Sequence, residues 1–144
     1  MMAEPFTSLL HRERFLLMVA EDDMSLYDSE RACLFYLIAG NNELYRKRRF
    51  IYDPTDHRIR ACLGNPDVDF SSGMRSLVRL GFNLYNGWSD RYTTPLSLLG
   101  SLDTANLLLA GNAIMIRFNR RFLEELVWEQ PLTAAMNQPE RRCT

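Results

Sequence analysis

Apolar residues recur at helical spacing along most of the chain, and one stretch is apolar around nearly the whole circumference of a helix. It runs from Leu102 to Phe118, and Asp103 is a residue type that commonly caps a helix N-terminus. The stretch is too short and contains too many polar residues to span a bilayer. We therefore expect a helix over about 103–118 to form the buried axis of the fold.

The same periodicity predicts further helices, each with a capping residue or a stop near its ends. They cover about residues 8–20, 29–40, 42–49, 72–86 and 95–99. The apolar run Ala32–Ala39 could also form a buried strand, but Asp28 before it and Gly40 after it favour a helix. Residues 53–70 have the composition of a loop, in which Arg58–Leu63 could form a strand or an extended arm.

This pattern shows no alternation of strands and helices, so we expect an all-α fold. It would be a compact bundle of five or six helices around the central apolar helix at about 103–118. A length of 144 residues suits one domain, and a hydrophobic content of 47% is enough for its core. We expect residues 1–130 to form this single helical domain and residues 131–144 to be a flexible tail.

Charges are unevenly distributed, although the formal net charge is only −1. Residues 1–30 hold two basic and seven acidic residues, whereas residues 31–62 hold seven basic and three acidic ones. We expect the two segments to pair with each other in the fold rather than to form a binding patch. The near-neutral total argues against a general polyanion binder and against an acidic mimic of DNA.

The three cysteines indicate a reducing compartment, because their number is odd and none has CxxC spacing. The first residues lack the basic region and long apolar core of a signal peptide. No segment is long and apolar enough to cross a membrane. We therefore expect a cytoplasmic protein.

The sequence carries no established catalytic, nucleotide-binding or metal-binding motif. His11 and His57 lie 46 positions apart, and the mixed group Asp53, Asp56, His57 and Cys62 has no known metal-ligand spacing. The patterns GxGxxG, GxxxxGK and GxSxG are missing. We expect no metal, no cofactor and no catalytic residues.

One surface segment combines basic and aromatic residues. The run Arg46, Lys47, Arg48 and Arg49 is flanked by aromatic residues, a combination that can hold a nucleic-acid backbone and stack on its bases. Four consecutive cations, however, spread around a whole helical turn. We therefore favour a solvated helix end over a nucleic-acid contact.

A second segment offers residue types that dominate protein-binding hot spots. It is the loop with Trp88, Arg91 and Tyr92. Trp88 could instead fold back on the core. Arg120 and Arg121 open a C-terminal extension and are further candidates for binding a partner.

Four polar residues interrupt the apolar helical stretches and are expected to form structural hydrogen bonds. They are Arg79, Asn83, Asn112 and Arg117. Because a buried amide is costly unless it is hydrogen-bonded, we expect Asn83 and Asn112 to have partners inside the fold. A structural role is favoured over a ligand site.

Three segments, taken together, resemble a known family. They are LFYLIAGN (34–41) with LY (44–45) and IYD (51–53), LVRLGFNLYNG (77–87), and LD (102–103) with NAIMIRF (112–118). In this order and spacing they resemble a small bacterial domain-of-unknown-function family of Gram-positive bacteria and their mobile elements. The resemblance covers about residues 8–118 and implies a compact, helical cytoplasmic protein, with no activity or site residues attached.

Three functional hypotheses follow from these patterns. The leading one is a non-enzymatic protein-interaction or regulatory protein, encoded by a phage or mobile element, that inhibits a host defence nuclease by direct docking. The second is a small nucleic-acid-binding module that uses residues 46–49 with Arg58 and Arg60. The third is an enzyme whose site is assembled from distant residues such as Asp53, His57 and Arg79. The oligomeric state stays open.

Overall fold

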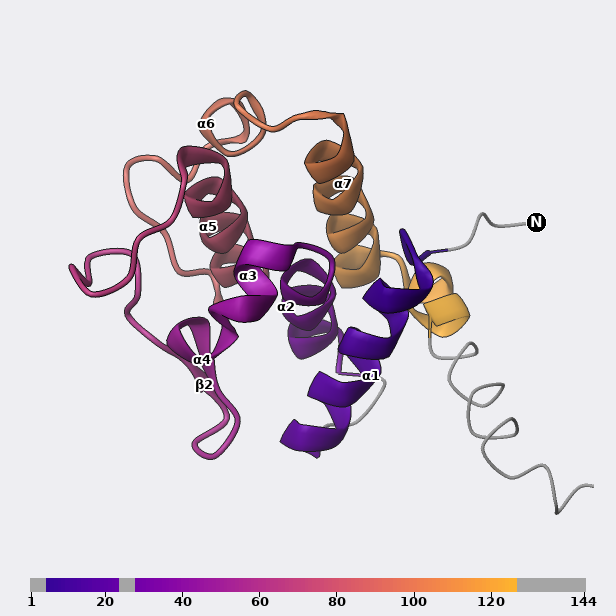
Figure 1. The fold of residues 1–144 in the computed structure, drawn as a ribbon. Coiled ribbons are helices and arrows are strands. Elements are labelled where there is room, and N and C mark those ends of the chain that lie inside the picture. Colours follow the sequence, from indigo (N-terminus) through magenta and orange to yellow (C-terminus); the bar gives the residue numbers. More distant parts are fainter. Residues whose placement is uncertain (1–4, 24–27, 127–144) are drawn as a thin grey trace, which may run out of the picture.

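Helices make up most of the computed structural model, which describes residues 5–23 and 28–126 (Figure 1). The helices are α1 (Leu9–Asp22), α2 (Ser29–Ala39), α3 (Asn42–Arg46), α4 (Arg48–Ile51), α5 (Ser72–Asn86), α6 (Pro95–Leu99) and α7 (Thr104–Phe118). A further helical segment covers residues 120–126. The all-α prediction is confirmed, and the predicted tail over 131–144 lies outside the described residues.

The described residues contain more helices than the five or six expected. The predicted helix over 42–49 is interrupted at Lys47, which ends α3 and precedes α4. The helical segment at 120–126 accounts for the other difference, since Asn119 leaves the helical conformation and ends α7.

Side-chain caps fix the starts of most helices, as the sequence predicted. The capping side chain accepts a hydrogen bond from the backbone N–H three residues later, which satisfies a donor that has no partner inside the helix. The caps of this kind are Ser8, Asp28, Asn41, Thr94 and Asp103. Gly87, with φ of 83°, ends α5 in the left-handed conformation that glycine adopts without strain.

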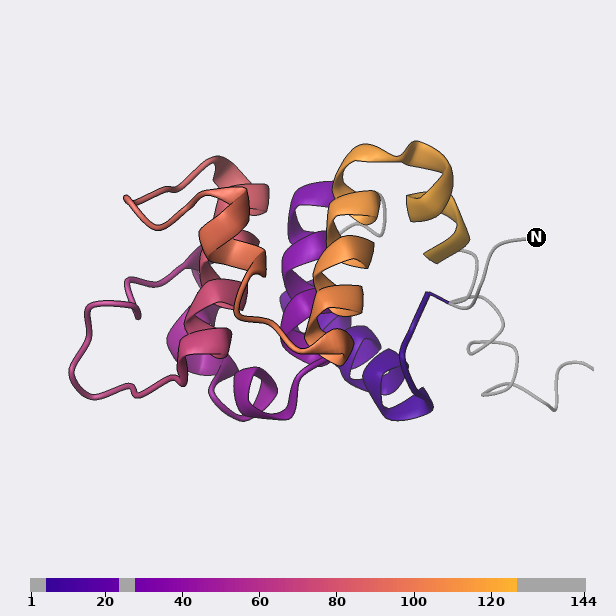
Figure 2. The same ribbon diagram turned by 90° about the horizontal axis from the view of Figure 1, so that it is seen from above.

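The buried axis of the bundle is α2, not α7. All residues from Ala32 to Ala39 are buried, and α2 packs against α1, α5 and α7. The prediction that the helix at 103–118 forms the axis is wrong, although its start at Asp103 and its end at Phe118 are confirmed. In α7 only one face is buried, because the helix lies beside α2 at the periphery (Figures 1 and 2).

A short hairpin follows α4. Strands β1 (Tyr52–Asp53) and β2 (Arg58–Ile59) pair antiparallel, with Tyr52 opposite Ile59 and Asp53 opposite Arg58. Asp53 organises the turn, because its carboxylate accepts hydrogen bonds from the N–H groups of Thr55 and Asp56. His57 completes the turn in the left-handed region, with φ of 56°.

Tyr36 connects the N-terminal segment to the rest of the bundle. Its hydroxyl donates a hydrogen bond to the Pro5 carbonyl and accepts one from the Asn112 amide at 2.9 Å. The Phe6 ring packs 5.9 Å from the Tyr36 ring and 5.5 Å from that of Phe15. Pro5 and Phe6, which precede α1, are therefore part of the core.

The His11 imidazole is buried where α1, α2 and α7 meet. The Thr7 N–H lies 3.1 Å from Nδ1, so Nδ1 accepts and Nε2 carries the proton toward the Tyr36 carbonyl at 2.9 Å. Gly40 makes room for this contact, because a Cβ there would overlap both Leu109 and His11. Burial disfavours the charged imidazole, whereas the hydrogen bond to the Tyr36 carbonyl favours it. The effect of burial is the larger, so the pKa of His11 is lowered to about 4.

His11 predicts a loss of stability in mild acid. Its folded-state pKa of about 4 lies below the ordinary 6.5, so between these values the unfolded chain binds more protons. The free energy of unfolding should therefore fall as the pH drops from 6.5 toward 4, by about 2 kcal/mol between pH 7 and pH 5. Urea unfolding at both pH values measures this difference. In His11→Gln the same difference should be smaller by that amount, and an unchanged pH dependence would contradict the assignment.

Candidate functional site

The loop between α5 and α6 is held in one conformation by Asp90. One oxygen of its carboxylate accepts from Arg79 Nε at 2.9 Å, and the other accepts from the Tyr92 N–H at 3.0 Å and the Thr93 hydroxyl at 2.9 Å. Partial burial alone would raise the pKa of Asp90, but these bonds and the Arg79 charge lower it. The loop is thus ordered by a charged group that stays ionised.

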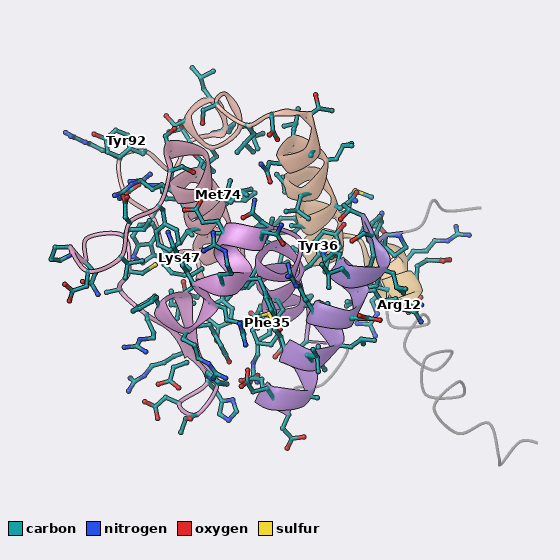
Figure 3. All side chains as sticks on the ribbon, viewed as in Figure 1. Arg12, Phe35, Tyr36, Lys47, Met74 and Tyr92 are labelled. Carbon is teal, nitrogen blue, oxygen red and sulfur yellow. The ribbon has the colours of Figure 1, made fainter. Side chains whose placement is uncertain are left out.

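Two guanidinium groups lie against the ring of Tyr92. Arg79 lies 5.0 Å and Arg91 4.8 Å from the ring centroid, and Arg91 also donates to the Tyr92 hydroxyl at 2.7 Å. The Tyr92 side chain is nonetheless 45% exposed and lies at the outer edge of the molecule (Figure 3). The sequence grouped Arg91 with Tyr92, and the structure adds Arg79 to them.

Trp88 folds back on the core, as the alternative prediction held. Its ring lies 5.6 Å from Phe82 in an edge-to-face arrangement. Asn83 donates to the Trp88 carbonyl at 3.1 Å, and the Trp88 N–H donates to Asn86 at 3.0 Å. The half-buried indole forms one wall of a surface hollow of about 240 Å³, with Phe82 and Arg60 among its lining residues.

The basic run is largely occupied by contacts within the chain. Lys47 pairs with Glu43 at 3.2 Å and donates to the Asp69 carbonyl, and Arg49 pairs with Glu21. Arg48 donates to the Tyr45 carbonyl and lies 4.1 Å from the centroid of its ring. Arg46 is exposed.

The pairing of the acidic and basic segments is confirmed at several positions. Glu21 pairs with Arg49, and Asp22 pairs with Arg31 at 2.6 Å and with His57 at 2.8 Å. Each of these pairs joins residues 1–30 to residues 31–62. The run at 46–49 is therefore better described as a packed helix end than as a free cationic surface.

Sequence reasoning missed the most tightly bonded charged group of the described residues. The Asp22 side chain is fully buried; it accepts hydrogen bonds from Arg31 Nη1 at 2.6 Å, the Tyr52 hydroxyl at 3.0 Å and His57 Nδ1 at 2.8 Å. Burial and the neighbouring Asp22 raise the pKa of Tyr52. Burial lowers the pKa of Arg31, but the hydrogen bond to Asp22 and the nearby charges of Asp22, Tyr52 and Asp28 together raise it above its ordinary value. The separations of 9, 30 and 35 residues give no local pattern that could have revealed the cluster.

The Asp22–His57 pair has the geometry of an oriented base. Because Nδ1 donates to Asp22, Nε2 of the neutral ring carries a lone pair, and the His57 side chain is 48% exposed. An enzyme would also need a reacting group beside Nε2. The two residues that the enzyme hypothesis grouped with His57 have other partners: Asp53 bonds its own turn, and Arg79 bonds Asp90.

The other predicted polar residues have structural partners at separate places. Asn112 donates to the Tyr36 hydroxyl, and Arg117 donates to the Leu84 carbonyl at 2.7 Å. Arg120 lies 3.4 Å from Glu124 on the solvent side of the helical segment 120–126, where Arg121 is also exposed. Within the described ranges, no group of three or more His, Cys, Asp or Glu residues could hold a metal ion. In the same ranges no helix has the length and apolar character needed to cross a bilayer.

Comparison with known proteins identifies one family. Its model matches residues 1–130 and carries the description "Family of unknown function (DUF6075)". No curated protein matches, and no solved structure matches.

Removal of the Asp22 charge should destabilise the fold. Asp22→Asn keeps the size of the side chain but removes the buried carboxylate that Arg31 faces and leaves the guanidinium with Asp28 alone, at a cost of about 1–3 kcal/mol in the free energy of unfolding. The neighbouring Asp23 is exposed and left-handed, a conformation that asparagine also tolerates. Asp23→Asn is therefore a matched control that should stay within about 0.5 kcal/mol of the parent. Equal losses in the two variants, measured by urea unfolding, would count against a structural role for Asp22.

Proposed function

This chain belongs to the DUF6075 family of unknown function, and we propose that it is a non-enzymatic protein-interaction module. The single observation that carries the proposal is the ordered, exposed Tyr92 with its two guanidinium neighbours. We also propose a cytoplasmic setting, which the free buried thiols of Cys33 and Cys62 support.

The Tyr92 cluster, defined as Arg79, Asp90, Arg91 and Tyr92, has the features of a binding hot spot. Tyrosine and arginine carry a large share of the energy at protein interfaces. A ring already held by two guanidinium groups loses little conformational freedom when a partner covers it. Leu96 lies four residues further on and is 83% exposed, so an apolar contact is available close by in the chain.

A nucleic-acid partner is less well supported. Binding to a phosphate backbone needs free cations on one surface. Lys47, Arg48 and Arg49 are instead engaged with Glu43, Tyr45 and Glu21. Formation of a nucleic-acid complex would first have to break some of these contacts.

Among the described residues, an enzymatic role rests on the Asp22–His57 pair. That pair also has a structural explanation, since Asp22 closes α1 against Arg31 of α2 and Tyr52 of β1. We therefore propose that this chain acts by binding a partner at its surface and not by catalysing a reaction.

The partner that we propose to test first is a host defence nuclease, which is the partner expected from the resemblance to a family of Gram-positive bacteria and their mobile elements. Because the net charge of this chain is only −1, such inhibition would proceed by docking on the nuclease and not by imitation of DNA.

The proposal predicts that Tyr92→Ala lowers capture of a stoichiometric protein partner at least tenfold, as expected for an interface hot spot. Full-length tagged chain would be incubated with host lysate, and bound proteins quantified by mass spectrometry. Phe50→Ala is the matched control, since Phe50 is 43% exposed and Tyr92 45%. Capture by this control should equal that of the parent.

Three results would contradict the proposal. They are the absence of any stoichiometric partner, equal capture by Tyr92→Ala, and loss of capture after nuclease treatment of the lysate. The last result would favour the nucleic-acid module, whose binding should weaken steeply with salt.

A further inference from the structure

Helix α7 presents an apolar stripe that nothing in the described part of the chain covers. Its outward face carries Leu107, Leu108, Met115 and Phe118, which are 46%, 61%, 39% and 72% exposed. At 3.6 residues per turn these positions and Gly111 fall within about 100° of one another. The buried residues of α7, which face α2, occupy the opposite side. Scattered apolar side chains need no explanation, but a continuous stripe of them marks an interaction surface.

Gly111 lies at the centre of the stripe. It lies in the middle of α7, where glycine weakens a helix by about 1 kcal/mol relative to alanine. No packing against the described residues requires it, because a Cβ at this position would meet none of their atoms within 4 Å. Gly40 differs in this respect, since a Cβ there would overlap core side chains. A glycine on an exposed helix face allows the backbone of another element to approach closely.

We propose that the α7 stripe is a self-association surface, on which two copies of this chain pair through antiparallel α7 helices that cross at Gly111. In a two-fold pair each residue faces the one equally far on the other side of the crossing. Leu107 then faces Met115 of the second copy, and Thr104 faces Phe118. The stripe matches itself in this orientation because residues 104–116 carry no charge.

Charge at the two ends of α7 favours the same orientation. Asp103 caps the N-terminus, while Arg120 and Arg121 follow the C-terminus, and all three are exposed. Antiparallel pairing brings Asp103 of each copy close to the arginines of the other, whereas parallel pairing sets like charges side by side. Antiparallel helix dipoles add to the preference.

The size of the stripe predicts a reversible dimer. At 1.5 Å per residue, the 15-residue α7 is about 22 Å long. One helix face of that length covers far less than the roughly 800 Å² per partner that stable complexes bury. We therefore expect a dissociation constant on the order of 10–100 μM. The inference uses a different surface from the Tyr92 cluster and does not depend on the proposed function.

Sedimentation equilibrium of the full chain over a wide concentration range tests the dimer. The weight-average mass should rise from that of one chain toward that of two, and Leu108→Arg should weaken association at least tenfold. Leu17→Arg on α1 is the matched control, because Leu17 and Leu108 are both 61% exposed. A constant monomer mass at millimolar concentration would overturn the proposal, as would equal loss in both variants or none in either.

Gly111→Ala gives a second, independent readout. The substitution should raise the urea midpoint of the monomer, because alanine favours the helix, and should weaken the dimer at least tenfold, because the added methyl groups meet at the crossing. These two effects have opposite signs, so a fold defect cannot imitate them. A dimer as strong as that of the parent would refute the crossing at Gly111.

The orientation is tested by spin labels at Ala105→Cys in a Cys143→Ser background. Ala105 is exposed and lies six residues from Gly111. In an antiparallel pair the two labelled positions are about 18 Å apart along the helix axes, whereas in a parallel pair they lie side by side. Short distances would reject the antiparallel arrangement. If the chain stays monomeric but still captures a partner through Tyr92, the dimer proposal is refuted and the proposed function is not.

Discussion

The close packing of α2 is the constraint on which the rest of the structure depends. Eight consecutive residues of this helix are buried, so other helices must cover it on every side. Two glycines allow that coverage: Gly40 leaves room for Leu109 and His11, and a Cβ at Gly81 of α5 would crowd Leu34. A protein interior tolerates little extra volume at such points. The positions of α1, α5 and α7 are consequently set by how closely they can approach one central helix.

Polar groups at both ends of α2 complete this arrangement. At its N-terminal end Arg31 donates a hydrogen bond to the buried Asp22 of α1. At its C-terminal end the Tyr36 carbonyl accepts a hydrogen bond from the His11 ring. Each bond is buried or partly buried, and a misplaced α1 would leave both polar groups unsatisfied. The apolar contacts bring the helices together, while these bonds select one register of α1 along α2. Among the described helices that pack on α2, α7 keeps a solvent-facing apolar side.

The sequence was sufficient for most helix boundaries because caps are local. Asp28, Asn41 and Asp103 each bond an N–H three residues ahead, and that short range is visible in a linear pattern. It was insufficient for the choice of the axis. An all-apolar helix at 103–118 and a shorter apolar run at 32–39 differ in where tertiary contacts fall, and hydropathy does not record this. The exposed face of α7 is the reason for the error, since exposed apolar residues look the same in sequence as apolar residues that fill a core.

The same difference between local and distant contacts decides which parts of the candidate sites could be predicted from the sequence. The loop with Arg91 and Tyr92 was visible because adjacent residue types indicated it, whereas the contact of Arg79 with that loop depends on the course of the chain after α5. The N-terminal segment covers Tyr36. Phe6 packs beside the Tyr36 ring, and the Pro5 carbonyl accepts a hydrogen bond from the Tyr36 hydroxyl. A chain shortened beyond Phe6, by aminopeptidase trimming or by internal translation initiation, would lack both contacts and would expose the ring of Tyr36 to water.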